Sequence, residues 1–446
     1  MNRRAAGVAL AAVFAAQLLV MITTAARDPH VDEVEYLHAG WLLKNGSRLY
    51  VDFFEHHSPL LFAPLAWLAP HGERVDVKPF AIRARVLFGA CGLLALGVFA
   101  AILWRIDPWA AVIAVSAIFS TGAFWLRVIA DVRAEPVAIA LFWLGVLCAL
   151  RSRGTLGGVG IGLLVLAALF TPKWPLTSAF VAIVWLMRAE RKVRGILAAA
   201  AVALLGLIAI RVLVPFDLWW KFNFDVNVAI AKQLATDASR PDTPFVFAPV
   251  IFRPLVLFVL ALLVLVRRDR IGALAAAFFL IVAIEVRFVL PYPYLWVHYF
   301  VMWSFAGAAL VGLAPRALER IRFARPAAIA MLLVVLWAHA IALWAVGRGG
   351  DGIYWLTQRT LTAALKPGET VWLPTARHPI SVRDAHYYWF APQEMAGAAG
   401  AKGEWPVCAP PPSLRFVGKG MVESDCFDRL PTRRTPIPDI YEVLPR

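Results

Sequence analysis

The sequence predicts an all-α polytopic membrane protein of about eleven transmembrane helices, with a small C-terminal extracytoplasmic α/β domain. Hydrophobic residues make up 61% of its 446 residues, and the mean hydropathy is +0.70, whereas a soluble domain is about 45–50% apolar. Apolar runs long enough to cross a bilayer recur along the chain. Repeated runs of this length favour helices over a β-barrel.

The first apolar run, 5–26, follows Arg3 and Arg4 and predicts an uncleaved first span with a cytoplasmic N-terminus. A signal peptide cleaved after residues 24–26 has a similar pattern and stays the alternative. Residues 60–70 are too short to span and predict an interfacial helix. Further spans are predicted at 82–104, 108–126, 136–150, 156–170, 174–187, 195–214, 250–266, 271–286, 294–314 and 327–346.

The basic residues predict the topology of these spans. The net charge is +15, yet the basic residues gather at the ends of apolar runs rather than in a stripe with aromatics. This pattern excludes nucleic acid as a partner. The basic connections on the cytoplasmic side are Arg105, 151–153, 188–194, 267–270 and 316–325. The alternate connections then face outside: 27–81, 127–135, 171–174, 215–249 and 285–294.

Two domains follow from this organisation. Residues 1–346 form the transmembrane domain, with a first outer loop at 27–81 that carries the chemistry, and 347–446 form a periplasmic soluble domain. Short strand-like runs at 370–374 and 414–418, between Gly and Pro residues, predict a small mixed core in that domain. The Gly-rich stretch 154–162 is apolar and predicts close helix packing.

The first outer loop is rich in acids and histidines, and it contains the candidate catalytic pair Asp32 and Glu33. If 31–45 is a helix, Asp32, Glu35 and Tyr36 share one face. A carboxylate there is suited to act as a general base toward a hydroxyl or amine. The alternative is a solvated amphipathic helix whose acids stabilise its N-terminal end.

The same loop ends in a candidate metal site formed by Glu55, His56 and His57. Carboxylate and imidazole groups together are ligands for a divalent cation. Adjacent residues on a strand point in opposite directions, however, so three in a row seldom bind one ion. The alternative is a polar cluster that bonds lipid headgroups.

The other outer loops supply a second acid, Asp131, and groups suited to a donor phosphate. Ionisable groups at a membrane edge tend to face a cavity or a partner, and guanidinium matches phosphate geometry. These candidates are Arg127, Arg133, Lys173, His298 and Tyr299. The alternatives are a helix-end ion pair, a lysine snorkelling to headgroups and an aromatic anchoring belt. Residues 383–389 predict either a lid over the outer site or a solvated aromatic patch.

The order of these residues resembles the GT-C superfamily of membrane glycosyltransferases. The resemblance rests on Asp32-Glu33-x-x-Tyr36, Gly46-x-x-Leu49-Tyr50-x-Asp52-Phe53 and Glu55-x-x-x-Pro59-Leu60. The pattern is nearest to the protein O-mannosyltransferase, aminoarabinose transferase and rhizobial lipopolysaccharide transferase branches. It implies an inverting transfer of a hexose or pentose from a polyprenyl-phosphate donor to a lipid, glycan or protein acceptor.

The resemblance also implies roles and a location. Asp32 is the first-loop catalytic acid, Asp131 the second, and Glu55 a site or metal carboxylate, with all three around one outward-facing cavity. The location is the bacterial inner membrane, with the active site facing the periplasm and a role in cell-envelope glycan biosynthesis. The chain departs from the aminoarabinose branch at Glu35, where that branch has a basic residue, and at 56–59, where it has Lys-Pro-Pro.

Two rival functions stay open at this point. A secondary transporter places its site near the bilayer midplane, whereas the ionisable residues here lie at the outer ends of the runs. A non-catalytic subunit with a GT-C-like fold is the second rival.

Overall fold

The computed structural model describes residues 3–120, 131–236, 270–286, 301–317, 352–387, 389, 411–418, 421, 427–428 and 430–444. The chain divides into two compact units. The helical unit comprises Met1–Ala25, Val86–Leu207 and Ala238–Gly349. The mixed unit comprises Ala26–Arg85, Ile208–Asp237 and Gly350–Arg446, so the first outer loop and the C-terminal residues belong to one unit.

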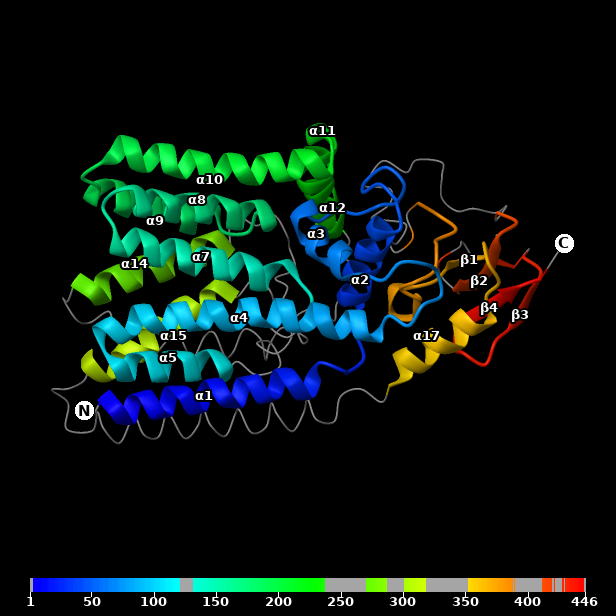
Figure 1. Cartoon of the computed structure of the whole chain (residues 1–446), viewed down its shortest axis with the longest axis horizontal. Helices are drawn as coiled ribbons and strands as arrows, with labels where there is room; N and C mark the ends of the chain where they lie inside the picture. The colour runs from blue at the N-terminus through cyan, green and yellow to red at the C-terminus, as the bar shows by residue number, and fades with distance from the viewer. Residues whose placement is uncertain are drawn as a thin grey trace. The chain divides into compact units, whose positions relative to one another are not determined.

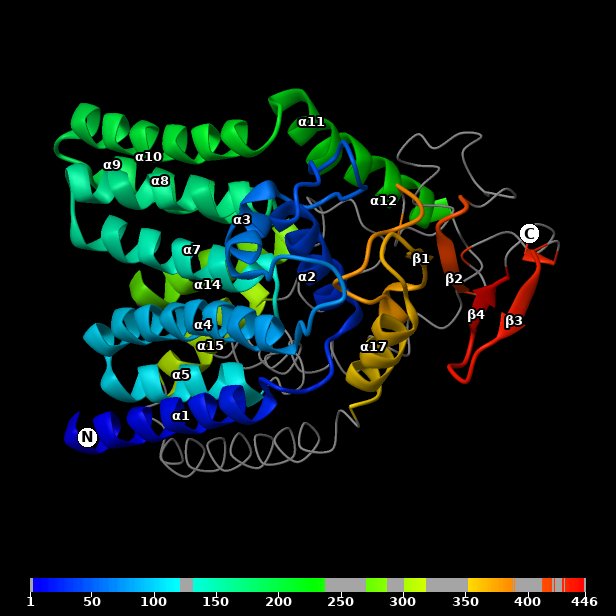
Figure 2. The same cartoon turned by 45° about the vertical axis from the view of Figure 1, so that its right-hand side comes forward.

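In the helical unit, apolar helices lie alongside one another (Figures 1 and 2). They are α1 (Arg3–Thr24), α4 (Lys78–Ile106), α5 (Pro108–Ser120), α7 (Ala134–Arg151), α8 (Thr155–Phe170), α9 (Pro175–Arg188), α10 (Lys192–Leu213), α14 (Arg270–Ile284) and α15 (Val301–Ala317). Their shared core contains the rings of Phe99, Trp143 and Phe305, with centroids about 5 Å apart. The ends of α4 and α10 extend into the mixed unit.

Four of the described helices are long and apolar enough to cross a membrane: α1, α4, α7 and α10. Only 11% of the apolar window of α10 is buried within the protein. A continuous apolar surface of this size is unfavourable in water and matches a lipid-facing helix. The helices predicted between residues 5 and 214 form at their predicted positions within the described residues; the end of the predicted span 108–126, from residue 121 on, lies outside them. The predicted spans at 250–266 and 327–346 lie outside the described residues, so the count of eleven stays a prediction.

The Gly-rich stretch of α8 allows the close helix contact that its sequence predicts. A Cβ at Gly158 would lie 1.9 Å from the carbonyl oxygen of Gly195 in α10, and one at Gly160 would lie 2.5 Å from that of Gly145 in α7. Any larger side chain would push these backbones apart. The prediction of close packing at 154–162 is therefore confirmed.

The mixed unit begins with the two helices predicted in the first outer loop, α2 (Val31–Lys44) and α3 (Pro59–Leu68). His30 caps α2, and Pro59 occupies the first turn of α3, where its missing N–H leaves no helix bond unmade. A later segment adds α11 (Phe216–Trp220), the π-helix η1 (Lys221–Asp225) and α12 (Val226–Thr236).

The C-terminal part of the mixed unit is a small β-sheet with one helix packed against it. The described residues form one four-stranded sheet, in the order β1-β2-β4-β3. Its strands are β1 (Thr370–Trp372), β2 (Leu414–Gly418), β3 (Thr432–Arg434) and β4 (Ile440–Val443), and only the β1–β2 pair is parallel. Helix α17 (Ile353–Ala364) covers this sheet through Leu361 (Figure 2). The two predicted strands are confirmed; the predicted domain boundary at 347 lies outside the described residues.

Candidate functional site

Glu33 is held in a buried ion pair. Its carboxylate accepts hydrogen bonds from Arg85 Nε at 2.9 Å and Nη2 at 2.8 Å, and Arg27 lies 4.0 Å away. It also accepts the His30 N–H at 2.9 Å, which closes the capping box of α2. Burial raises the pKa of Glu33, but the charges and hydrogen bonds of Arg85 and Arg27 together lower it to about 2. These contacts give Glu33 a structural position.

Asp32, the neighbouring acid, has different surroundings. Its side chain is 34% exposed, and its Oδ2 lies 3.8 Å from His30 Nδ1. It occupies the first turn of α2, where the helix dipole stabilises a carboxylate. Asp32 therefore presents an accessible carboxylate on a rigid, capped helix, as a general base requires.

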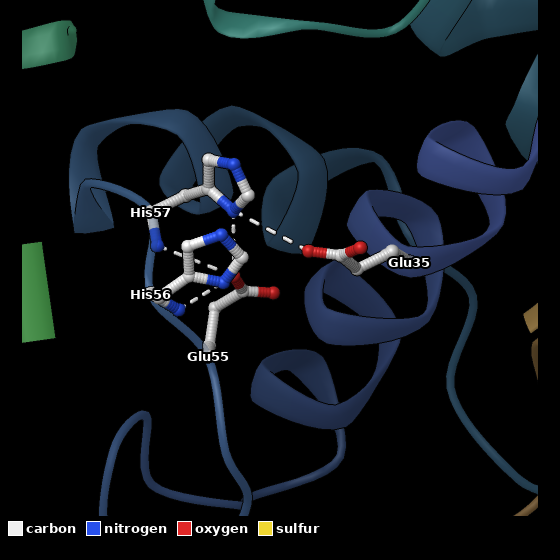
Figure 3. Close-up of side chains that lie close together, drawn as sticks. All are labelled: Glu35, Glu55, His56 and His57. Carbon is white, nitrogen blue, oxygen red and sulfur yellow. Dashed lines mark hydrogen bonds and ion pairs between the residues drawn. The ribbon is translucent and has the colours of Figure 1, made fainter. Parts of the chain in front are cut away.

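Helix α2 also brings Glu35 to the Glu55-His56-His57 segment (Figure 3). His57 Nδ1 lies 2.7 Å from Glu55 Oε1 and 3.3 Å from Glu35 Oε1. Glu55 Oε1 also accepts the backbone N–H groups of His56 at 2.8 Å and His57 at 3.2 Å. One ligand atom from each of these four residues lies within 4.8 Å of the others. They are called the acid–imidazole cluster below.

Burial and mutual charge set the protonation of the acid–imidazole cluster. Burial and the neighbouring charge of Glu55 raise the pKa of Glu35, a group normally ionised at neutral pH. Burial opposes a charge on His57, but the neighbouring side chains of Glu55 and Glu35 raise the pKa of His57 to about 10. Without a cation, His57 is thus an imidazolium and Glu35 a neutral acid at pH 7.

Side chains from outside the loop fix this turn. Tyr50, in the left-handed region at φ 66°, donates its hydroxyl hydrogen to the carbonyl of His57. Asn223 Nδ2 donates to the Tyr50 hydroxyl at 2.8 Å, and Asn227 Nδ2 donates to the His56 carbonyl at 2.9 Å. Both amides belong to the 221–236 segment, so two distant parts of the mixed unit hold the histidine backbone in place.

The acid–imidazole cluster fits a divalent cation. Its donor set of two imidazoles and two carboxylates suits Zn²⁺ and similar metals. Glu35 Oε1 and Glu55 Oε2 are buried without a hydrogen-bond partner, which a bound cation would supply. Adjacent residues point in opposite directions only on a strand, and His56 and His57 lie in an irregular turn instead. Metal binding itself stays a prediction.

In the helical unit, the second-loop residues form a buried charge group. Asp131 is fully buried, and Arg133 is 6% exposed at the start of α7. Glu135 accepts from Arg133 Nε at 3.4 Å and from Lys173 Nζ at 2.5 Å. Glu135 is therefore the shared counter-ion of two of the predicted phosphate-binding cations.

The remaining predicted residues have different outcomes. Arg127, His298 and Tyr299 lie outside the described residues. The 383–389 segment is not a solvated patch, because Trp389 is fully buried and the Tyr387 carbonyl accepts the Phe54 N–H at 2.8 Å. The convergence of Asp131 with Asp32 and Glu55 on one cavity stays a prediction, since they belong to different units.

Glu35 is the site residue that the sequence undervalues most. It appears there only as a departure from a related branch and as a helix-face neighbour of Asp32. The sequence signal for Glu35 is its position next to Tyr36 on α2. Both side chains contact His57, and the Tyr36 hydroxyl lies 3.2 Å from Nε2.

Comparison with known proteins gives an informative structural match. No family model matches the chain, and no curated protein matches it. Among solved structures, the chain is similar to the crystal structure of ArnT from Cupriavidus metallidurans bound to undecaprenyl phosphate. The TM-score is 0.60 at 14% sequence identity, and the match covers 88% of each chain. The chain therefore has an ArnT-like polytopic fold, helical with a small C-terminal sheet.

Proposed function

We propose that this protein is a membrane glycosyltransferase that transfers a sugar from a polyprenyl-phosphate donor to an acceptor outside the cytoplasmic membrane. The observation that carries the proposal is the fold match along 88% of both chains with ArnT, whose structure holds undecaprenyl phosphate. Four membrane-length helices agree with a lipid-linked donor. The location proposed is the bacterial inner membrane, with the site facing the periplasm.

Asp32 is the proposed general base. An inverting transfer needs a carboxylate that removes the proton from the acceptor nucleophile as the sugar–phosphate bond breaks. Of the two adjacent acids, Asp32 is partly exposed, whereas both oxygens of Glu33 are bound by Arg85. We therefore assign the proton transfer to Asp32 and the positioning of α2 to Glu33.

Cationic side chains are proposed to stabilise the departing polyprenyl phosphate. Arg133 and Lys173 share the carboxylate of Glu135, so their charges are already gathered and partly desolvated. A phosphate that displaced Glu135 from one of them would gain charge-assisted hydrogen bonds. Asp131, next to this group in the chain, is the proposed second acid. A cation bound by Glu35, Glu55, His56 and His57 would supply further positive charge.

The test is a transfer assay on the full chain in proteoliposomes. Polyprenyl-phosphate-linked hexoses and pentoses are supplied with an envelope extract as acceptor, and released polyprenyl phosphate is measured. Asp32→Asn keeps the shape of the side chain and removes its basicity. We expect it to lower the rate by at least about 100-fold with unchanged membrane insertion.

Asp52→Asn is the matched control, because Asp52 is an acid of the same loop whose carboxylate pairs with exposed Arg48. It should keep the wild-type rate. If no donor is cleaved by wild-type protein, or if Asp32→Asn is as active as wild type, the proposal is wrong. Donor-independent movement of solute across the vesicle would instead favour the transporter alternative.

A further inference from the structure

A second group of buried titratable side chains lies apart from the acid–imidazole cluster. It consists of His38 on α2, His378 just after the 3-10 helix η4 (Thr375–Arg377), and Asp384 beside β1. Both imidazoles are fully buried, and the Asp384 side chain is 7% exposed. Burying three such groups is unfavourable unless each has a hydrogen-bond, charge or metal partner.

The carboxylate of Asp384 lies between the two rings. His38 Nε2 is 2.8 Å from one carboxylate oxygen, and His378 Nε2 is 2.6 Å from the other. The second contact lacks hydrogen-bond geometry, and neither ring nitrogen of His378 has a hydrogen-bond partner. One ligand atom from each residue lies within 4.8 Å of the others.

The surroundings orient these groups. His38 Nδ1 lies 2.7 Å from the carbonyl oxygen of Ile380, so Nδ1 is the donor there. In the neutral ring this leaves Nε2, the nitrogen that faces Asp384, as the one with a lone pair for a metal. The buried ring of Trp389 packs against both imidazoles, with centroids 4.4 Å and 4.9 Å away. An apolar wall and a carbonyl behind the imidazole are the usual outer shell of a metal-binding histidine.

We propose that His38, His378 and Asp384 bind a divalent transition metal such as Zn²⁺ and thereby fasten α2 to the C-terminal part of the chain. Two imidazole nitrogens and one carboxylate oxygen are borderline ligands of the kind that Zn²⁺ prefers. Without a metal, neither buried ring nitrogen of His378 makes a well-aligned hydrogen bond, which is unfavourable for a buried polar group. A metal uses the nitrogen that faces Asp384. The proposal does not depend on the proposed enzyme activity.

The experiment isolates this site by removing the other one. In the background variant Glu55→Gln/His57→Gln, the full chain is purified in detergent, dialysed against buffer with Zn²⁺ and then without it, and its metal content is measured by mass spectrometry. We expect one bound metal per chain. Adding His378→Gln or Asp384→Asn should lower the metal content by about tenfold or more.

His71→Gln is the matched control, because His71 is an exposed histidine of the same unit; it should keep the metal. If the His378 and Asp384 variants do not fold, the background protein itself is loaded with Co²⁺ and its visible spectrum decides. Absorption bands of a four-coordinate nitrogen and oxygen site support the proposal. A background protein that binds no metal, or a folded His378→Gln protein that retains it, overturns the proposal.

Discussion

Arg85 in α4 donates hydrogen bonds from two nitrogens to the carboxylate of Glu33, at 2.9 Å and 2.8 Å, although the residues are 52 positions apart. Both side chains are almost completely excluded from solvent. Glu33 also caps α2, so this pair fixes the helix that carries Asp32 and Glu35. The pair therefore links the end of a membrane-length helix to the candidate site within the mixed unit.

The first prediction is that Glu33→Gln acts through stability. It leaves Arg85 as a buried charge without its counter-ion, which destabilises a protein by about 3–5 kcal/mol. Thermal unfolding of the purified protein should show a clear drop, and any lost activity should follow the folded fraction. Asp52→Asn, which breaks an exposed pair, should unfold near the wild-type temperature. A stable Glu33→Gln protein without activity would instead make Glu33 catalytic.

The second prediction concerns acid. The pKa of Glu33 is lowered in the folded state from 4.5 to about 2, so the unfolded chain takes up its proton first. The stability that Glu33 contributes is therefore complete above about pH 4.5 and is lost as the pH falls toward about 2. Between pH 5 and pH 3, the free energy of unfolding should fall more steeply with pH for wild type than for Glu33→Gln. Equal slopes would show that the ion pair is not formed.

Local patterns in the sequence predict the elements of this protein well. The outer-loop helix, the short helix after it and the strands β1 and β2 form where hydrophobic spacing, Pro and Gly place them. The contact of α8 with its neighbours follows from the glycines alone. These features depend on residues within a few turns of one another.

The partners in the candidate site are harder to predict, because they come from distant segments. Asp384 and His38 are 346 positions apart, and the pattern of neither residue indicates the other. The sequence offers both Asp32 and Glu33 as catalytic acids. They are distinguished only by the contact of Arg85 with Glu33, which the structure shows. Periodicity identifies the face of a helix but not the charge that it meets.

The third prediction separates the two acids of the acid–imidazole cluster. Burial and Glu55 raise the pKa of Glu35, so Glu35 is a neutral acid at pH 7 without metal, and Glu35→Gln replaces it with a neutral group of the same shape. Metal-free Glu35→Gln should therefore unfold near the wild-type temperature. Glu55→Gln should unfold at a clearly lower temperature, because it leaves the His57 imidazolium buried without its closest carboxylate.

The same two proteins test the cation. Added Zn²⁺ should raise the unfolding temperature of wild type through mass action, and it should raise that of Glu35→Gln much less, because one ligand is gone. An identical rise in both proteins would remove Glu35 from the metal site.

The fourth prediction tests the contact between α8 and α10. Gly158→Ala adds a Cβ that would meet the Gly195 carbonyl at 1.9 Å, so the two helices must separate. We expect a lower unfolding temperature and a lower yield of inserted protein. Gly97→Ala is the matched control, because nothing lies within 4 Å of a Cβ at that helical position. Equal yields and unfolding temperatures for the two variants would contradict this close packing.

The fifth prediction concerns the donor phosphate. Lys173 and Arg133 share Glu135, so removing one cation leaves the other more tightly bound to that carboxylate and less able to take a phosphate. Lys173→Met keeps much of the apolar stem and removes the charge. Because a charge-assisted hydrogen bond contributes about 1.5–3 kcal/mol, the KM for the polyprenyl-phosphate sugar should rise by about tenfold or more.

Two further variants make this test specific to the charge group. Lys192→Met removes an exposed lysine at the start of α10, and it should leave the KM unchanged. Glu135→Gln releases both cations from their counter-ion, so it should lower the KM if folding is intact. A KM that is the same in Lys173→Met, Glu135→Gln and wild type would place the donor phosphate elsewhere, because no competition between Glu135 and a phosphate would then exist.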